Sequence, residues 1–196
     1  MRLVFITGFL LMVAAQWYAP LSIIVQANDT IDEGHEYLFK TRPVDPSDPF
    51  RGKYITLSFE AENYIAHDST ETKFAPYSTV YAVLDSDSLG FAKIAHIQAG
   101  EPDNAVDYIP VEFQSGWYDS TSMNVLVRFP FSRFYLEESK ASETEQLYWQ
   151  SRSDSTSVCY AKVKVLNGDT KLTDVIINDS SIVDVVKRIN ADKVND

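Results

Sequence analysis

The pattern of hydrophobic and polar positions begins with a run that carries no charge, from Leu3 to Val25. A helix of about 20 apolar residues spans the hydrocarbon core of a bilayer, so this run is long enough to cross one. Arg2 precedes the run, and the first charges after it are acidic, beginning at Asp29. The positive-inside bias therefore predicts a transmembrane anchor at residues 1–27, with its N-terminus in the cytoplasm and the rest of the chain outside it.

A cleaved signal peptide is the second interpretation of the same run. Residues 25–27 (Val-Gln-Ala) fit a small-x-small cleavage site, with Ala27 as the last residue removed. The run is longer than the apolar core of a usual signal peptide. It also contains residues 16–20 (Gln-Trp-Tyr-Ala-Pro), which suit either an aromatic contact with a partner helix or a proline kink. Both interpretations carry the remainder of the chain across the membrane.

The remainder alternates apolar and polar positions in short segments. Residues 28–36 are polar and acidic and are predicted to be a spacer, and residues 37–196 are predicted to be one extracytoplasmic domain. Within that domain, runs rich in β-branched and aromatic residues are separated by turn signals, a pattern typical of antiparallel strands. The strands are expected at residues 37–41, 53–65, 79–84, 91–98, 108–113, 124–131, 158–166 and 171–177.

Two segments near the C-terminus have the pattern of helices instead. Residues 137–151 contain no glycine or proline and begin with glutamates, which suit a helix N-terminus. Residues 180–190 place isoleucines and valines at helical spacing. The predicted fold class is therefore α+β: an N-terminal transmembrane helix followed by a mainly antiparallel, β-rich domain with one or two helices near the C-terminus.

A proline-rich turn leads into the expected strand at 53–65. Three of the eight prolines fall within residues 43–49, where they stiffen the backbone. Asp45 and Asp48 each precede a proline and can cap turns by accepting backbone N–H groups, while Arg51 bridges the two carboxylates. Alternatively, the carboxylates are acid–base groups or cation ligands, and the arginine positions an anion. A glycine at position 52 then frees the backbone for a sharp turn.

Residues 43–59 resemble the signature of the GDYXXLXY family of membrane-anchored bacterial proteins. That signature is Gly-Asp-Tyr-x-x-Leu-x-Tyr, commonly preceded by a Pro-x-Asp-Pro-Arg-Asp-like run, and it is matched here by Gly52, Tyr54 and Leu57. Lys53 stands in place of the aspartate, which reverses a charge, and the last tyrosine is a phenylalanine. The resemblance implies an anchored envelope protein with a β-rich domain. It implies architecture and location rather than an activity.

A second group of interest contains Arg133, Tyr135 and Glu138. It is similar to a stretch associated with the same family, in which two aromatic residues precede a glutamate that opens a helix. One interpretation has Tyr135 and Glu138 lining a pocket beside Arg133. The other places the aromatic residues in the core and uses Glu138 to favour the helix start.

Composition and charge narrow the classes of partner. Hydrophobic residues make up 45% of the chain and aromatic residues 13%, which is ample for a packed core. The formal net charge is −11, and Arg2 is the only charged residue among the first 27. Nucleic acid and anionic lipid headgroups are therefore poor partners for the domain. Membrane attachment must come from apolar insertion of the helix, and another integral membrane protein is an expected kind of partner.

Candidate chemistry is sparse. His35, His67 and His96 are isolated in sequence, and Cys159 is the only cysteine, so neither a metal site nor an intrachain disulfide is predicted. The chain has no glycine-rich phosphate loop and no G-x-S-x-G elbow, and no cofactor is predicted. Cys159 itself is expected to be a small buried residue in a strand.

These observations support three hypotheses. The first is a membrane-anchored envelope protein that acts as a non-catalytic accessory or interaction module of another membrane protein. The second is an extracytoplasmic enzyme that depends on carboxylates such as Asp45, Asp48 or Glu138. The third is a secreted, soluble binding module that exposes Trp117 and Tyr118. Convergence of the carboxylates in one pocket would favour the second hypothesis, and removal of the anchor would favour the third.

Overall fold

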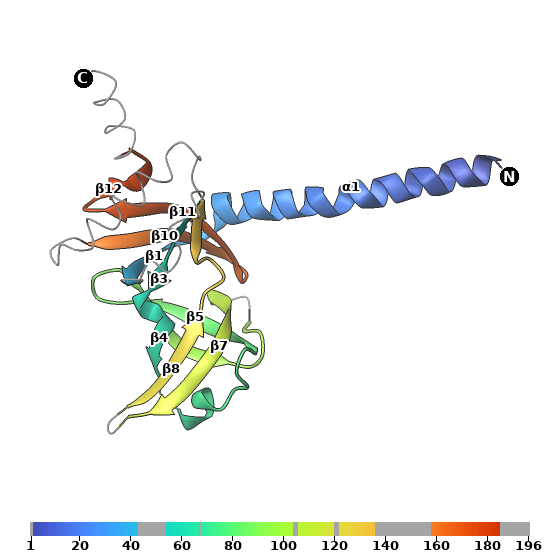
Figure 1. Ribbon diagram of the computed structural model, residues 1–196. Helices are drawn as coiled ribbons and strands as arrows, with labels where there is room; N and C mark the ends of the chain where they lie inside the picture. Colours follow the sequence, from blue (N-terminus) through green and yellow to red (C-terminus); the bar gives the residue numbers. More distant parts are fainter. Residues whose placement is uncertain are drawn as a thin grey trace, which may run out of the picture.

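The protein consists of one long helix followed by antiparallel β-sheets, so it is an α+β protein (Figure 1). The computed structural model describes residues 2–42, 54–66, 68–103, 106–119, 122–135 and 158–184. The fold class expected from the hydrophobic pattern is confirmed.

The helix α1 (Arg2–Glu33) extends away from the sheets, with the N-terminus at its far end (Figure 1). At 1.5 Å per residue its 32 residues measure about 48 Å. Its part from Phe5 to Glu33 is long and apolar enough to cross a membrane. The helix continues beyond residue 27, through residues placed in the expected spacer, and the first strand begins only two residues after it ends.

The first sheet lies beside the C-terminal end of α1, and we call it the anchor-side sheet. Its strands are antiparallel, and its core-facing positions alternate with more exposed ones along the strand from Cys159. In spatial order the strands are β12 (Ser180–Ser181), β11 (Asp169–Ile177), β10 (Cys159–Leu166), β1 (His35–Arg42) and β3 (Ser58–Phe59).

The second sheet lies farther from the helix, and we call it the distal sheet (Figure 1). In spatial order its strands are β4 (Asn63–Ile65), β8 (Met123–Arg128), β7 (Tyr108–Tyr118), β5 (Thr79–Ser86) and β6 (Ala92–Gln98). A bulge that leaves Ala95 without a partner residue on β5 disturbs the register of β5 and β6, and another disturbs β7 and β8. Because bulges bend strands, the sheet curls until its two edge strands approach each other as a near-barrel.

The prediction of one continuous strand at residues 53–65 is wrong. The segment is divided into β2 (Tyr54–Thr56), β3, a 3₁₀ turn η1 (Glu60–Glu62) and β4, and the three strands pair with three different partners. The backbone N–H of Phe59 donates to the Glu62 carboxylate at 3.1 Å, which turns the chain from one sheet into the other. Alternation alone could not reveal this change of sheet, because it continues on both sides of the turn.

Four phenylalanine rings lie where the two sheets meet. The Phe39 ring centroid is 5.7 Å from that of Phe59 and 5.1 Å from those of Phe129 and Phe131. The contacts of Phe39 are edge-to-face, an arrangement that aromatic rings favour. All four side chains are buried, so this cluster joins the anchor-side sheet to the segment that follows the distal strand β8.

The remaining expected strands are confirmed, with ends that move by a few residues. Asn167 and Gly168 join β10 to β11, and both have positive φ, as a tight two-residue hairpin turn requires. Cys159 is buried in β10, as expected. The expected helix at 137–151 lies outside the described residues. Of the expected helix at 180–190, residues 182–184 are helical and the part from 185 lies outside the described residues.

Candidate functional site

The structure brings together the two segments that the sequence singled out. Strand β2 pairs antiparallel with β9 (Arg133–Tyr135), so that Tyr54 lies opposite Tyr135 and Thr56 lies opposite Arg133. The ladder continues at Leu57, whose N–H donates to the Ser132 carbonyl at 2.8 Å. We call this two-stranded element the motif ribbon.

The two faces of the motif ribbon differ in exposure. Leu57 is 2% exposed and Phe134 is buried, so these side chains belong to the core. Tyr135 and Arg133 flank Phe134 on the other face, where both are exposed. The structure therefore gives the matched leucine a packing role and directs Arg133 and Tyr135 outward. The other predicted site residues, Asp45, Asp48, Arg51, Gly52 and Glu138, lie outside the described residues.

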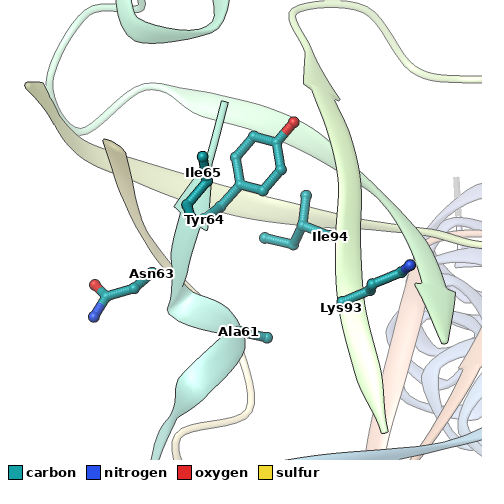
Figure 2. A pocket seen from close by; sticks show the side chains of 6 residues that line it. All are labelled: Ala61, Asn63, Tyr64, Ile65, Lys93 and Ile94. Atoms are coloured by element: carbon teal, nitrogen blue, oxygen red, sulfur yellow. The ribbon is translucent and has the colours of Figure 1, made fainter. Parts of the chain in front are cut away.

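A cavity of about 230 Å³ lies at the seam where the distal sheet fails to close. Figure 2 shows Tyr64 of β4 and Ile94 of β6 pointing toward each other across it. The Tyr64 hydroxyl lies 2.9 Å from a carboxylate oxygen of Glu71 and 3.2 Å from the carbonyl of the bulged Ala95. The lining consists of Ala61, Asn63, Tyr64, Ile65, Lys93 and Ile94. It offers mainly apolar contact, because the Lys93 ammonium is paired with Asp85 at 3.0 Å.

A third feature is the junction between α1 and the anchor-side sheet. The Gln26 side-chain amide donates a hydrogen bond to the Asp169 carboxylate, at the start of β11. Thr30 is fully buried, and its hydroxyl donates to the Gln26 carbonyl at 2.9 Å. The Lys164 ammonium donates to the Gly34 carbonyl at 2.9 Å. The last turns of the helix are therefore fixed to the sheet by side chains on both partners.

Gly34 lets the backbone pass close to the sheet at this junction. A Cβ at this position would lie 2.3 Å from the Thr30 carbonyl oxygen and 3.0 Å from that of Val165. Both obstacles are backbone atoms, which cannot swing aside. The chain can turn from α1 into β1 this tightly only because the residue has no side chain.

The distal sheet reaches the same junction through Tyr108 of β7. Its ring is 2% exposed, and its hydroxyl donates to the Glu101 carboxylate and lies 3.2 Å from the Asn167 carbonyl. The hydrogen bond to Glu101, followed by burial, raises the pKa of Tyr108 to about 12. A Cβ on Gly168 would lie 2.7 Å from the Tyr108 ring, so the turn and the ring are in close contact. Asp169, the residue that follows this turn, accepts the hydrogen bond from Gln26.

A second tyrosine ties β1 to the segment that precedes β7. The Tyr37 hydroxyl donates to the Asp107 carboxylate at 2.9 Å, and His35 Nδ1 lies 2.6 Å from the same oxygen. Burial and the neighbouring carboxylate raise the pKa of Tyr37 well above its usual range. No sequence pattern predicts either tyrosine contact, because the partners are far apart along the chain and belong to no motif.

Two other groups have structural roles in the described residues. The Asp87 carboxylate accepts the N–H groups of Leu89 and Phe91, so this acidic residue caps the β5–β6 hairpin. Trp117 and Tyr118 are 44% and 62% exposed at the end of β7, where Tyr118 reaches the Thr72 hydroxyl at 3.3 Å. Among the described residues, no three side chains of the metal-ligating kinds lie close enough together to hold an ion.

A family model described as "GDYXXLXY protein" matches residues 16–175. The match begins in the middle of α1 and ends in β11, so it includes the junction, the distal sheet, the motif ribbon and all of the anchor-side sheet except β12 and the end of β11. No curated protein and no solved structure matches the chain.

Proposed function

The chain belongs to the GDYXXLXY family, and on that premise we propose that it is a membrane-anchored protein of the bacterial cell envelope. Its extracytoplasmic domain acts as a non-catalytic interaction module of another membrane protein. The observation that carries this proposal is the junction: the apolar part of α1 projects from the domain, while its polar end is built into the fold.

The junction supports retention of the helix rather than its removal. The helix continues without interruption past Ala27, the last residue of the alternative cleavage site. Cleavage there would remove Gln26. The hydrogen bond from its side chain to Asp169 would be lost, and so would its backbone carbonyl, which accepts from the Thr30 hydroxyl. Thr30 would remain as a buried hydroxyl without that partner, which is unfavourable. A segment made only to be discarded has no need of these contacts.

The charges that flank the helix support an extracytoplasmic domain. Arg2 is the only charged residue before Asp29, and the positive-inside bias keeps that end in the cytoplasm. The docked helix end also keeps the domain close to the membrane surface, because the expected spacer is largely helical and held against β10 and β11. A domain held this way suits contact with the extracytoplasmic face of a neighbouring membrane protein.

The mass of the mature chain and its fractionation test retention of the anchor. We expect the full-length chain, including residues 1–27, in membranes that have been washed with alkaline carbonate. A chain that begins at Asn28 and is released into the soluble fraction would overturn the anchor and favour the secreted binding module. The exposure of Trp117 and Tyr118 would then mark the surface to investigate.

Reporters fused after Asp196 test the orientation. An alkaline phosphatase fusion is expected to be active, because this enzyme folds only outside the cytoplasm, and a β-galactosidase fusion at the same position is expected to be inactive. The reverse pattern would place the domain in the cytoplasm. Exchange of Arg2 for glutamate, with a lysine pair added after residue 27, is the matched control that should weaken the expected orientation.

A further inference from the structure

The junction fixes how deeply α1 can lie in a bilayer. Gln26 is bonded to the domain, and Arg2 is charged, so only residues 3–25 are free to cross the hydrocarbon core. At 1.5 Å per residue these measure about 35 Å, against a core about 30 Å thick. The helix can therefore slide by only about 5 Å along the membrane normal.

Three polar side chains fall near the middle of this span: Gln16, Trp17 and Tyr18. They lie within about 6 Å of the midpoint of residues 3–25, measured along the helix. Tryptophan and tyrosine in membrane helices are normally found in the belts at the two interfaces, about 15 Å from the centre. The limited freedom to slide cannot bring these residues to either interface.

None of the three side chains has a hydrogen-bond partner within the described part of the chain, and Trp17 and Tyr18 are 66% and 74% exposed. Pro20 adds a fourth polar group, because it has no N–H to donate to the carbonyl of Gln16, four residues earlier. Ser22 provides a contrast on the same helix, since its hydroxyl donates to the Ala19 carbonyl at 2.8 Å. In hydrocarbon the unpaired groups are costly, and lipid tails supply no partner.

The arrangement of the three side chains indicates what kind of partner could satisfy them. Successive residues in a helix are separated by about 100°, so three consecutive side chains span about 200° of its circumference. One neighbouring helix covers a single stripe, as in a two-helix dimer, and leaves at least one of the groups in lipid. The negative charge of the domain also opposes close packing of copies side by side.

We propose that Gln16, Trp17, Tyr18 and the freed Gln16 carbonyl form a docking site for at least two transmembrane helices of one multi-spanning membrane protein. Those helices supply hydrogen-bonding side chains near the middle of the bilayer, where such bonds hold helices together. This inference rests on the proposed function, because it requires that the anchor be retained. We call these four groups the polar band.

Photo-crosslinking from the two sides of the helix tests the proposal. Met12 and Leu21 are nine positions apart, so they lie on opposite sides of α1, and both are about half exposed. Replacing each with benzoyl-phenylalanine in the full-length chain leaves the polar band intact. We expect both probes to crosslink, in native membranes, to different transmembrane segments of the same multi-spanning protein, identified by peptide mass spectrometry. Crosslinks to lipid alone, or between copies of this chain, would overturn the proposal.

The matching loss-of-binding variant is Gln16→Leu/Trp17→Phe/Tyr18→Phe. It removes the three polar side chains while preserving apolar bulk, and we expect recovery of the crosslinked protein by co-purification to fall by about tenfold or more. Ser22→Ala is the control and should leave recovery unchanged, because its hydroxyl is satisfied within the helix. Equal recovery with the triple variant would overturn the polar band as the docking site.

The two proposals fail in different ways. If the chain recovered from cells lacks residues 1–27, the anchor itself is wrong. If the full-length chain is present in membranes but both probes label only lipid, the anchor stands and the docking site is wrong.

Discussion

The anchor-side sheet and the distal sheet have the same number of strands but are used differently. The anchor-side sheet receives the end of α1 through Gln26, Thr30 and Gly34, and its β10–β11 turn is held from two directions. The distal sheet curls into a near-barrel and leaves a cavity at its seam. The end of α1 is therefore fastened to the anchor-side sheet, while the distal sheet lies farther from the helix (Figure 1).

The two sheets are nevertheless one mechanical unit. The phenylalanine cluster joins them through buried rings, and Tyr108 carries a contact from the distal sheet to the β10–β11 turn. Truncating a ring that both sheets share should therefore cause the largest loss in the free energy of unfolding.

Phe59→Ala should have the largest effect, because it removes a fully buried ring from the cluster between the sheets. We expect a loss of about 3–5 kcal/mol in the free energy of unfolding, with both sheets melting together. Phe91→Ala is the matched control, with a loss of about 1 kcal/mol, since that ring is only partly buried. Urea unfolding of the full chain in detergent, followed by circular dichroism, measures both. Separate transitions in the Phe59 variant would show that the sheets are independent.

Glu62→Ala should come next, because Glu62 fixes the turn from one sheet into the other. Its carboxylate is almost fully buried and accepts from Ser58 at 2.7 Å and from Arg42 at 3.3 Å, in addition to the Phe59 N–H. Its removal takes away the acceptor that these three donors share, and we expect a loss of about 2–3 kcal/mol. Glu60→Ala, two residues away and largely exposed, should change stability by less than about 0.5 kcal/mol. Equal effects of the two variants in thermal melts would contradict the proposed role of Glu62.

Gly34→Ala should disturb the anchor-side sheet alone. The added Cβ meets backbone oxygens at the junction, so the helix end must shift, at a cost of about 2 kcal/mol. Gly100→Ala is the control, because nothing lies within 4 Å of a Cβ there and the change should be nearly neutral. Hydrogen exchange should show faster exchange around β1 and β10 than around β7 and β8. Uniform acceleration in both sheets would mean that the junction supports the whole domain equally.

The smallest expected effect is a loss of stability at alkaline pH through Tyr108. Its folded pKa of about 12 lies above the unfolded value of 10.0, so its contribution is complete below pH 10 and is lost as the pH rises toward 12. At pH 11 the loss should be about 1 kcal/mol. Tyr108→Phe should be less stable at pH 8 and should lose less between pH 9 and 11 than the wild type, whereas Tyr118→Phe should follow the wild type. Parallel pH profiles for Tyr108→Phe and the wild type would rule out this contribution.

The candidate sites were only partly predictable from sequence. The sequence singles out both the signature at residues 43–59 and the segment that contains Arg133 and Tyr135, but their meeting in the motif ribbon follows from pairing of strands that are distant in sequence. No sequence pattern predicts the cavity at the seam, because its two walls come from edge strands that approach each other only when the distal sheet curls. Local patterns record which face of a strand is buried, and they do not record which strand lies beside it.

The features that follow directly from the sequence are local: an apolar run long enough for a membrane helix, the alternation of the strands, and the Asn-Gly turn that closes β10 onto β11. These depend on transfer of side chains from water and on backbone sterics, which act between near neighbours. The division of the segment 53–65 between the sheets, and the bonds of Gln26 to Asp169 and of Gly34 to Lys164, follow instead from long-range packing. Those outcomes depend on polar groups finding partners across the fold, and such partners are set by the packing of the whole domain.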